Sequence, residues 1–353
     1  MTVETVLVVG PSWVGDMVMA QSLFKALLQR NPDSKIDVLA PAWSLPILAL
    51  MPEVRQQITM PVGHGKLALG TRYRLAQKLA GTGYDQAIVV PNSLKSSLIP
   101  AFARIPIRTG WLGEVRYGLL NDHRKLDKQK FPLMVQRLVA LAGPEGAALP
   151  EPLPEPELCA KVESVAATAR SFLDWEDGDT EKRPLLALCP GAEFGAAKQW
   201  PPQHYARVAS HYLQLGWHVV LLGSGNDVDC CNELLAEVDN LAGGTCRNLA
   251  GQTNMEEVVN LLSLASLVVS NDSGLMHIAA ALLRPTIAVY GATSPDFTPP
   301  LAASATIVRN DIDCSPCFAR ECPLGHHRCM KELAPDRVIA AANQLLSQPL
   351  RGI

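Results

Sequence analysis

The chain of 353 residues lacks several features that would assign it to common protein classes. No apolar run reaches the 18 or so residues that a transmembrane helix needs, and the first residues read as a strand rather than a signal peptide. Nine cysteines show no regular disulfide spacing, which suits a reducing compartment. Aromatic residues make up only 5% and form no nucleic-acid-binding module. We therefore expect a cytoplasmic protein with no nucleic-acid partner.

Two phosphate-binding motifs are incomplete. A glycine-rich loop after the first apolar run has the spacing of a phosphate loop, but Asp16 and Met17 stand where Lys and Ser or Thr are needed. Gly223 and Gly225 begin a dinucleotide fingerprint whose third glycine is replaced by Val228. These substitutions argue against a nucleoside triphosphatase and a Rossmann dehydrogenase. No Asp-x-Asp metal motif is evident near the candidate site, so we expect chemistry without a required metal or cofactor, stimulated at most modestly by a divalent cation.

Charge is unevenly distributed along the chain. Residues 1–150 hold 17 Lys and Arg against 10 Asp and Glu, whereas residues 151–353 hold 14 against 24. A basic first half predicts an anionic partner, which an acidic substrate, a membrane surface or nucleic acid would each provide. Without interleaved aromatic residues, a phosphorylated substrate ranks above nucleic acid. The basic side chains, each expected at the surface, include Lys66, Arg72, Arg74, Lys95, Arg104, Arg108 and Arg116.

Short apolar runs alternate with helical patterns in both halves, which predicts α/β domains with mostly parallel, doubly wound sheets. The Pro-rich residues 143–157 read as a linker. We expect domains at 1–157 and 158–334 facing across a cleft, and a helix within 335–353 that could pack back on the first domain. Expected strands are 6–9, 36–40, 86–90, 185–189, 217–222, 267–270 and 286–290; expected helices include 17–30, 73–79, 159–173 and 335–346.

The stretch 267–295 reads as a strand, a polar turn, a helix and a second strand. Ser273 and Gly274 open the helix, where amides can bind a phosphate. Asp272 would repel a phosphate but could accept hydrogen bonds from sugar hydroxyls; alternatively, Asp272 and Ser273 only cap the helix. His277 lies one turn later, facing a ligand or serving as a structural residue.

Other polar residues follow other expected strands. Asp16 begins a helix, where its carboxylate either complements the helix dipole or acts as a general base. Lys198 lies in a glycine-rich loop that could close over a phosphate. A polar cluster, Pro91–Ser97, follows the strand at residues 86–90, on the side where ligands bind in such sheets.

The segment near the C-terminus combines Cys314-Ser-Pro-Cys317 with Cys322, two histidines and Cys329. The CxxC spacing resembles part of a zinc ribbon, but the other spacings are irregular. Both a structural metal and ordinary reduced thiols remain open.

Four motifs together closely resemble the glycosyltransferase family 9 heptosyltransferases. They are Gly15-Asp16, Pro91-Asn-Ser-Leu-Lys-Ser, Lys198-Gln-Trp-Pro and Asn271-Asp-Ser-Gly-Leu-Met-His, and the resemblance covers nearly the whole chain. It implies a GT-B fold and inverting transfer of L-glycero-D-manno-heptose from ADP-heptose. The implied acceptor is the first heptose of the lipopolysaccharide inner core, carried on a phosphorylated lipid A–Kdo–heptose at the cytoplasmic face of the inner membrane, with which the protein would make peripheral contact.

The resemblance also assigns roles to residues. It implies that Asp16 is the base, that Lys198 binds the diphosphate and that the backbone of Thr253–Met255 meets adenine. The implied donor-binding residues are Thr253, Asn254, Met255, Asp272, Ser273, Gly274 and His277, and the acceptor-binding residues are Asn92, Ser93 and Lys95.

Two other functions are weighed against this one. A sugar-nucleotide epimerase of the same fold is the alternative, although it would not need a basic first domain. A two-lobed binding protein would usually carry an export signal.

Overall fold

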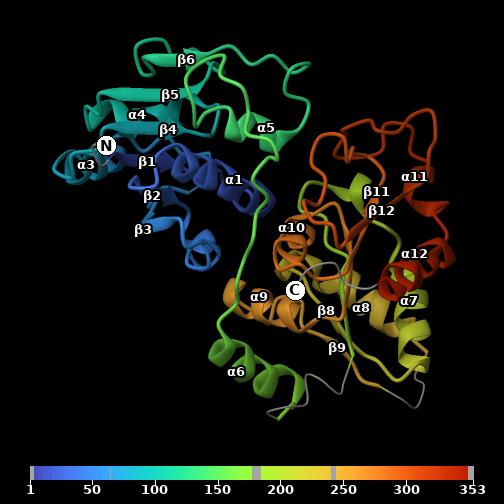
Figure 1. Ribbon diagram of the computed structural model, residues 1–353. Coiled ribbons are helices and arrows are strands. Elements are labelled where there is room, and N and C mark those ends of the chain that lie inside the picture. Colours follow the sequence, from blue (N-terminus) through green and yellow to red (C-terminus); the bar gives the residue numbers. More distant parts are fainter. Residues whose placement is uncertain (1–3, 64, 177–183, 240–243, 349–353) are drawn as a thin grey trace. The chain divides into compact units, whose positions relative to one another are not determined.

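The computed structural model describes residues 4–63, 65–176, 184–239 and 244–348. The chain divides into two compact units between Pro156 and Glu157, inside the Pro-rich stretch. Each unit contains one six-stranded parallel sheet with helices, as expected for doubly wound α/β domains (Figure 1). In the part of the chain that is described, no helix combines the length and the hydropathy needed to cross a bilayer.

Unit 1 is built on a sheet of order β3-β2-β1-β4-β5-β6. The chain adds β2 and β3 on one side of β1 and then returns to add β4, β5 and β6 on the other side. The direction of the strand order therefore reverses between β1 and β4. Residues Leu7 and Val9 of β1 share a core cluster with α3 and α4, and right-handed crossovers place α1 on the opposite face. The strands are β1 (Thr5–Val9), β2 (Lys35–Ala40), β3 (Val54–Thr59), β4 (Gln86–Val89), β5 (Ile107–Trp111) and β6 (Asp122–Arg124); the helices are α1 (Val14–Arg30), α2 (Leu45–Leu48), α3 (Leu69–Ala80), α4 (Leu94–Phe102) and α5 (Met134–Val139).

Unit 2 repeats the plan with the order β12-β11-β10-β7-β8-β9, which reverses between β7 and β10. Strands β7, β10 and β11 are buried along their whole length, because helices cover both faces of the sheet. Its strands are β7 (Leu185–Cys189), β8 (His218–Leu221), β9 (Cys246–Asn248), β10 (Leu267–Asn271), β11 (Thr286–Tyr290) and β12 (Ala305–Arg309); its helices are α6 (Val162–Leu173), α7 (Pro202–Gln214), α8 (Val228–Ala236), α9 (Met255–Leu264), α10 (Gly274–Ala281), α11 (Arg328–Lys331) and α12 (Pro335–Ser347).

The C-terminal helix α12 is part of unit 2. It packs against α7, β11 and β12, and its buried Val338, Ala342 and Leu345 belong to the core of that unit. Figure 1 shows α12 beside α7. The sequence set residues 335–353 apart as a helix that could pack on the first domain; residues 335–348 are instead built into the second, and 349–353 lie outside the described residues.

Candidate active site

The polar loops of unit 2 gather where its strand order reverses. Lys198 ends the short 3-10 helix η3 (Ala196–Lys198) in the loop after β7, and Asp272 follows β10 directly. Because β7 and β10 are neighbouring parallel strands, their carboxyl ends meet at one edge of the sheet. The crevice at such a reversal is the general ligand site of open α/β sheets.

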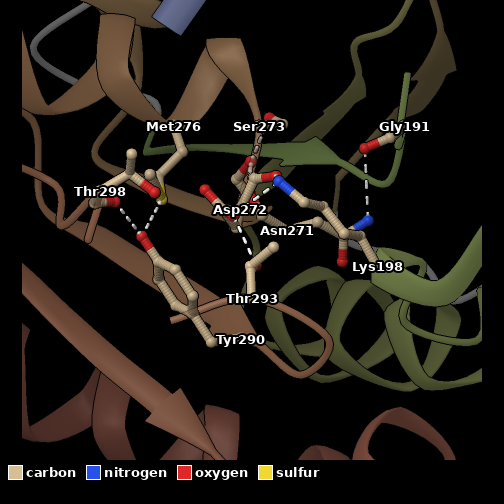
Figure 2. A network of polar contacts seen from close by, with 10 residues as sticks. Gly191, Lys198, Asn271, Asp272, Ser273, Met276, Tyr290, Thr293 and Thr298 are labelled. Atoms are coloured by element: carbon tan, nitrogen blue, oxygen red, sulfur yellow. Dashed lines mark hydrogen bonds and ion pairs between the residues drawn. The ribbon is translucent and has the colours of Figure 1, made fainter. Parts of the chain in front are cut away.

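A buried network is centred on Asp272 (Figure 2). Lys198 Nζ donates to Asp272 Oδ2 at 2.6 Å and to its backbone oxygen at 3.3 Å. The hydroxyl of Thr293, in the loop after β11, donates to the same carboxylate oxygen at 2.6 Å. Asp272 is only 6% exposed and Lys198 14%, so the pair is held largely out of water. The carboxylate therefore binds the lysine and the threonine hydroxyl and does not cap α10.

Asn271 ties the two loops together. Its Nδ2 donates to the Pro190 backbone oxygen at 2.7 Å, and its Oδ1 accepts hydrogen bonds from Trp200 N at 3.2 Å and Tyr205 Oη at 2.9 Å. Asn271 is fully buried, so all three bonds lie in a dry interior. The loop that contains Lys198 is thereby anchored at both ends to the last residue of β10, directly before Asp272.

Ser273 and Gly274 begin α10, as predicted. Ser273 is the N-cap residue but makes no side-chain cap; its hydroxyl lies 3.1 Å from that of Ser270. The first amides of a helix have no partner within the helix and can bind an anion. Neither side chain makes the capping hydrogen bond that the simple capping interpretation requires, and the ligand-binding role of this turn stays a prediction.

His277 is buried in α10. Its imidazole pKa is lowered to about 4: burial is the main cause, the Asp272 carboxylate partly opposes the shift, and the Lys198 charge makes a smaller contribution that lowers the pKa. The ring is therefore neutral at pH 7 and carries one N–H donor and one acceptor nitrogen. Such a ring can make hydrogen bonds at a diphosphate site without adding charge to it.

His277 should make folding sensitive to mild acid. The unfolded chain takes up a proton near pH 6.5, whereas the folded ring stays neutral until about pH 4, so stability is lost as the pH falls through this window. We expect the free energy of unfolding in urea to drop by about 3 kcal/mol more in wild type than in His277→Asn between pH 7 and 4. Parallel pH profiles for the two proteins would contradict this account.

Thr253, Asn254 and Met255 lie at the start of α9, after β9 at the same edge of the sheet. Asn254 Oδ1 accepts a hydrogen bond from Glu257 N at 3.0 Å, and Asn254 N donates to Glu257 Oε2 at 2.7 Å, so the Asn254 side chain is used for helix capping. The buried hydroxyl of Thr253 has no hydrogen-bond partner among the described residues. The assignment of this segment to adenine remains a prediction.

The sequence prediction missed Thr293 as a site residue. It lies in the Gly-Ala-Thr-Ser-Pro loop. Its position could have indicated a site residue, because it is a polar residue after the carboxyl end of β11, the strand next to β10. The sequence assigned Asn271 to the polar turn, whereas it is the last residue of β10, and only the strand order reveals which loops it joins.

The four cysteines Cys314, Cys317, Cys322 and Cys329 line one small pocket of about 20 Å³ together with His326 and His327. Cys322 Sγ accepts a hydrogen bond from His327 N at 3.4 Å, which contributes to a lowered thiol pKa. Burial raises the pKa of Cys329. Among the described residues, no group of three or more His, Cys, Asp or Glu side chains has the arrangement of a metal site. Both interpretations of this segment, a structural metal and reduced thiols, stay predictions.

In unit 1 the predicted residues flank the other reversal. Asp16 lies half-buried in the first turn of α1, after β1. Asn92, Ser93 and Lys95 follow β4, which pairs with β1 in parallel. Ser93 is the N-cap residue of α4 and its hydroxyl lies 2.6 Å from that of Ser96, whereas Asn92 accepts a hydrogen bond from Glu114 N at 3.2 Å. The sheet thus brings both predicted groups to one edge of unit 1.

Two of the basic residues predicted at the surface are buried. Arg116 is fully buried and donates to the backbone oxygens of Pro91 and Trp111 and, at 3.2 Å, to Ser97 Oγ. Arg72 is 5% exposed and donates to the Leu67 backbone oxygen at 2.7 Å. These guanidinium groups hold loops in place, because their five donors can satisfy several carbonyls at once. The expectation that they lie on the surface was wrong.

Two doubly wound domains with polar loops at their switch points are the architecture of the GT-B fold, and the comparisons with known proteins identify a glycosyltransferase. The model of glycosyltransferase family 9 (heptosyltransferase) matches residues 72–328. Lipopolysaccharide heptosyltransferase 2 of Salmonella typhimurium is 48% identical over 348 residues, covering 97% of this chain and 99% of the relative. Lipooligosaccharide heptosyltransferase 2 of Haemophilus ducreyi is 47% identical over 350 residues, with the same coverage. The structure of E. coli ADP-heptose LPS heptosyltransferase II superposes with a TM-score of 0.85 at 45% identity, covering 97% of this chain and 98% of that one.

The chain therefore belongs to glycosyltransferase family 9, the heptosyltransferases. It is an enzyme of heptose transfer in lipopolysaccharide core synthesis, and the epimerase alternative is set aside.

Proposed function

We propose that the enzyme transfers heptose from ADP-heptose to the first heptose of the inner core. The observation that carries this proposal is the Lys198–Asp272–Thr293 network at the switch point of unit 2, in a chain nearly half identical to lipopolysaccharide heptosyltransferase 2. A cation, a carboxylate and a helix start at one sheet edge suit a donor with a diphosphate and many hydroxyls.

Donor binding uses the network by exchange of partners. Without donor, the ammonium of Lys198 is paired with Asp272; with donor bound, it contacts the diphosphate. The amides of Ser273 and Gly274 also donate hydrogen bonds to the negatively charged diphosphate. The Asp272 carboxylate then accepts hydrogen bonds from the heptose hydroxyls, while Thr293 keeps it in place. Neutral His277 adds a hydrogen bond without attracting or repelling the phosphates. The backbone at Thr253–Met255 receives the adenine.

The chemical step is a single displacement with inversion. Asp16 accepts the proton of an acceptor hydroxyl, whose oxygen bonds to the anomeric carbon of heptose while the bond to the ADP oxygen breaks. Lys198 and the start of α10 stabilise the negative charge that develops on the departing ADP. ADP is a good leaving group, so the step needs no metal, and a divalent cation at most stimulates it. Asn92, Ser93 and Lys95 position the phosphorylated acceptor, with Lys95 supplying positive charge.

Following the donor with and without acceptor tests the reaction class. In excess EDTA, ADP-heptose should be consumed only when a heptosyl-Kdo acceptor is present, with one ADP released per sugar transferred. Consumption of donor alone would point to an epimerase or a hydrolase, and a complete block by EDTA that magnesium reverses would show that the reaction needs a metal.

We also propose that unit 1 meets the lipid part of the acceptor at the cytoplasmic face of the membrane. Large apolar side chains are exposed in the loops after the carboxyl ends of its parallel strands, where Trp13 follows β1 and Trp43 follows β2. Exposed Lys66 lies in a loop of the same edge, and half-buried Lys95 lies in the first turn of α4, which begins there. Apolar and basic side chains together suit an anionic lipid surface. We call this set the apolar edge; its members are Trp13, Trp43, Leu67, Val115 and Tyr117, which are 38–75% exposed.

Replacing Trp43 and Tyr117 together by Ser should weaken binding to anionic phospholipid vesicles at least tenfold, since each side chain loses its apolar contact with lipid. Turnover with a water-soluble, delipidated acceptor should stay within twofold of wild type. Ile107→Ser is the matched control, because Ile107 is 46% exposed at the amino end of β5, on the opposite edge. Equal vesicle binding by the double variant and by Ile107→Ser would refute the assignment.

A further inference from the structure

Two cations lie over one aromatic ring beside the Asp272 network. Phe194, in the loop after β7, has Lys198 Nζ 4.9 Å from its ring centroid and the guanidinium carbon of Arg320 5.5 Å from the same centroid. Arg320 comes from the cysteine-rich segment more than a hundred residues later in the chain. None of the motifs that assign the family to this sequence includes Phe194 or Arg320.

The backbone fixes Arg320 against the lysine loop. Ala197 N donates to the Arg320 backbone oxygen at 3.0 Å. Gly195 has φ +153° and lies so close that a Cβ there would stand 2.3 Å from that oxygen, so only glycine permits the approach. The same segment is bound to the loop after β11, where Phe318 N donates to the Ala292 backbone oxygen at 2.7 Å. Arg320 is thus positioned with the loops of Lys198 and Thr293.

Only one of the two charges over the ring is balanced by a protein carboxylate. Lys198 is paired with Asp272, whereas within the described ranges the exposed Arg320 guanidinium makes no hydrogen bond or ion pair and lies over Phe194. A guanidinium presents five donors and suits bidentate contact with phosphate oxygens. An anion beside the ring would be attracted by both cations.

We propose that Arg320 is a second cation for the nucleoside diphosphate and grips it together with Lys198. The inference rests on the proposed donor and adds a binding residue to that site. Phe194 serves as the platform that holds both cations toward the ligand. A role in which Arg320 only braces the loop is separable, because the hydrogen bond to the loop comes from the Arg320 backbone oxygen, which Arg320→Ala leaves in place.

Calorimetric titration of the full chain with ADP tests the proposal. We expect Arg320→Ala to raise the Kd for ADP about tenfold, Arg320→Lys to recover part of the loss, and Phe194→Leu to weaken ADP binding by a smaller factor. Binding of adenosine, followed by ligand-observed NMR, should not change. Arg309→Ala, which removes another unit 2 arginine paired with Asp311, is the charge-matched control and should bind ADP as wild type does.

The outcomes distinguish a failure of the Arg320 proposal from a failure of the proposed function. Unchanged ADP affinity in Arg320→Ala, or an equal loss for ADP and adenosine, would overturn the role of Arg320 and leave the proposed function intact. Failure of the wild-type chain to bind ADP would overturn the proposed function and this inference with it.

Discussion

Asp16→Asn is expected to lower kcat by roughly a hundredfold or more while the affinity for ADP-heptose stays unchanged, which is the usual cost of losing a general base. The amide is nearly the same size as the carboxylate but cannot accept the acceptor proton at neutral pH. Asp16 is proposed to act on the acceptor hydroxyl and is not among the proposed donor-binding residues, so the affinity for ADP-heptose should not change.

Pre-steady-state product formation and ADP-heptose titration on the same preparations measure the two effects separately. Asp33→Asn, an exposed carboxylate of the same unit, is the matched control and should keep full activity. Normal turnover in Asp16→Asn would remove Asp16 from the mechanism. A large loss of donor affinity would instead give it a role in binding.

Lys198→Ala is expected to have the second large effect, a fall in kcat/KM of about 10²–10³-fold, because one group that stabilises the departing diphosphate is lost. The variant should also be less stable, by about 2 kcal/mol, since Asp272 is left buried with only Thr293 to solvate it. Lys198→Arg should recover stability before it recovers activity, because its planar head does not reproduce the ammonium geometry.

The double variant Lys198→Met, Asp272→Asn distinguishes the two consequences of losing the lysine. Removing both charges should restore most of the unfolding free energy in urea, whereas transfer should stay as low as in Lys198→Ala. Recovery of activity in the double variant would mean that Lys198 serves only to neutralise Asp272. Wild-type stability in Lys198→Ala would mean that the ion pair does not contribute to the free energy of unfolding.

The buried strands were the most predictable part of the fold. Strands β7 and β11 have the predicted bounds, because a fully buried parallel strand reads as a continuous apolar run. Strand β3 was missed because its sequence, Val-Arg-Gln-Gln-Ile-Thr, is polar and half exposed at the sheet edge. Strands β5 and β6 carry Arg, Gly and Asp, which propensity does not assign to strands. Their pairing with neighbours decides their conformation.

The site was predictable in its residues but not in its contacts. The sequence indicated both Lys198 and Asp272, yet their ion pair joins residues 74 positions apart and depends on β7 lying next to β10. Thr293 depends on the same order, since it needs β11 on the other side of β10. The burial of Arg116 could not be read from composition, because its acceptors are backbone oxygens of a loop that follows another strand. These contacts could not be predicted because a single sequence does not show the order of the strands in the sheet.

Mass-detected transfer from ADP-heptose to purified inner-core acceptors that differ by one heptose tests the central claim most directly. The acceptor with one heptose should gain the mass of a single heptose, and the acceptor that ends in Kdo should gain none. Transfer to the acceptor that lacks heptose, or no transfer to the one that carries it, would contradict the account.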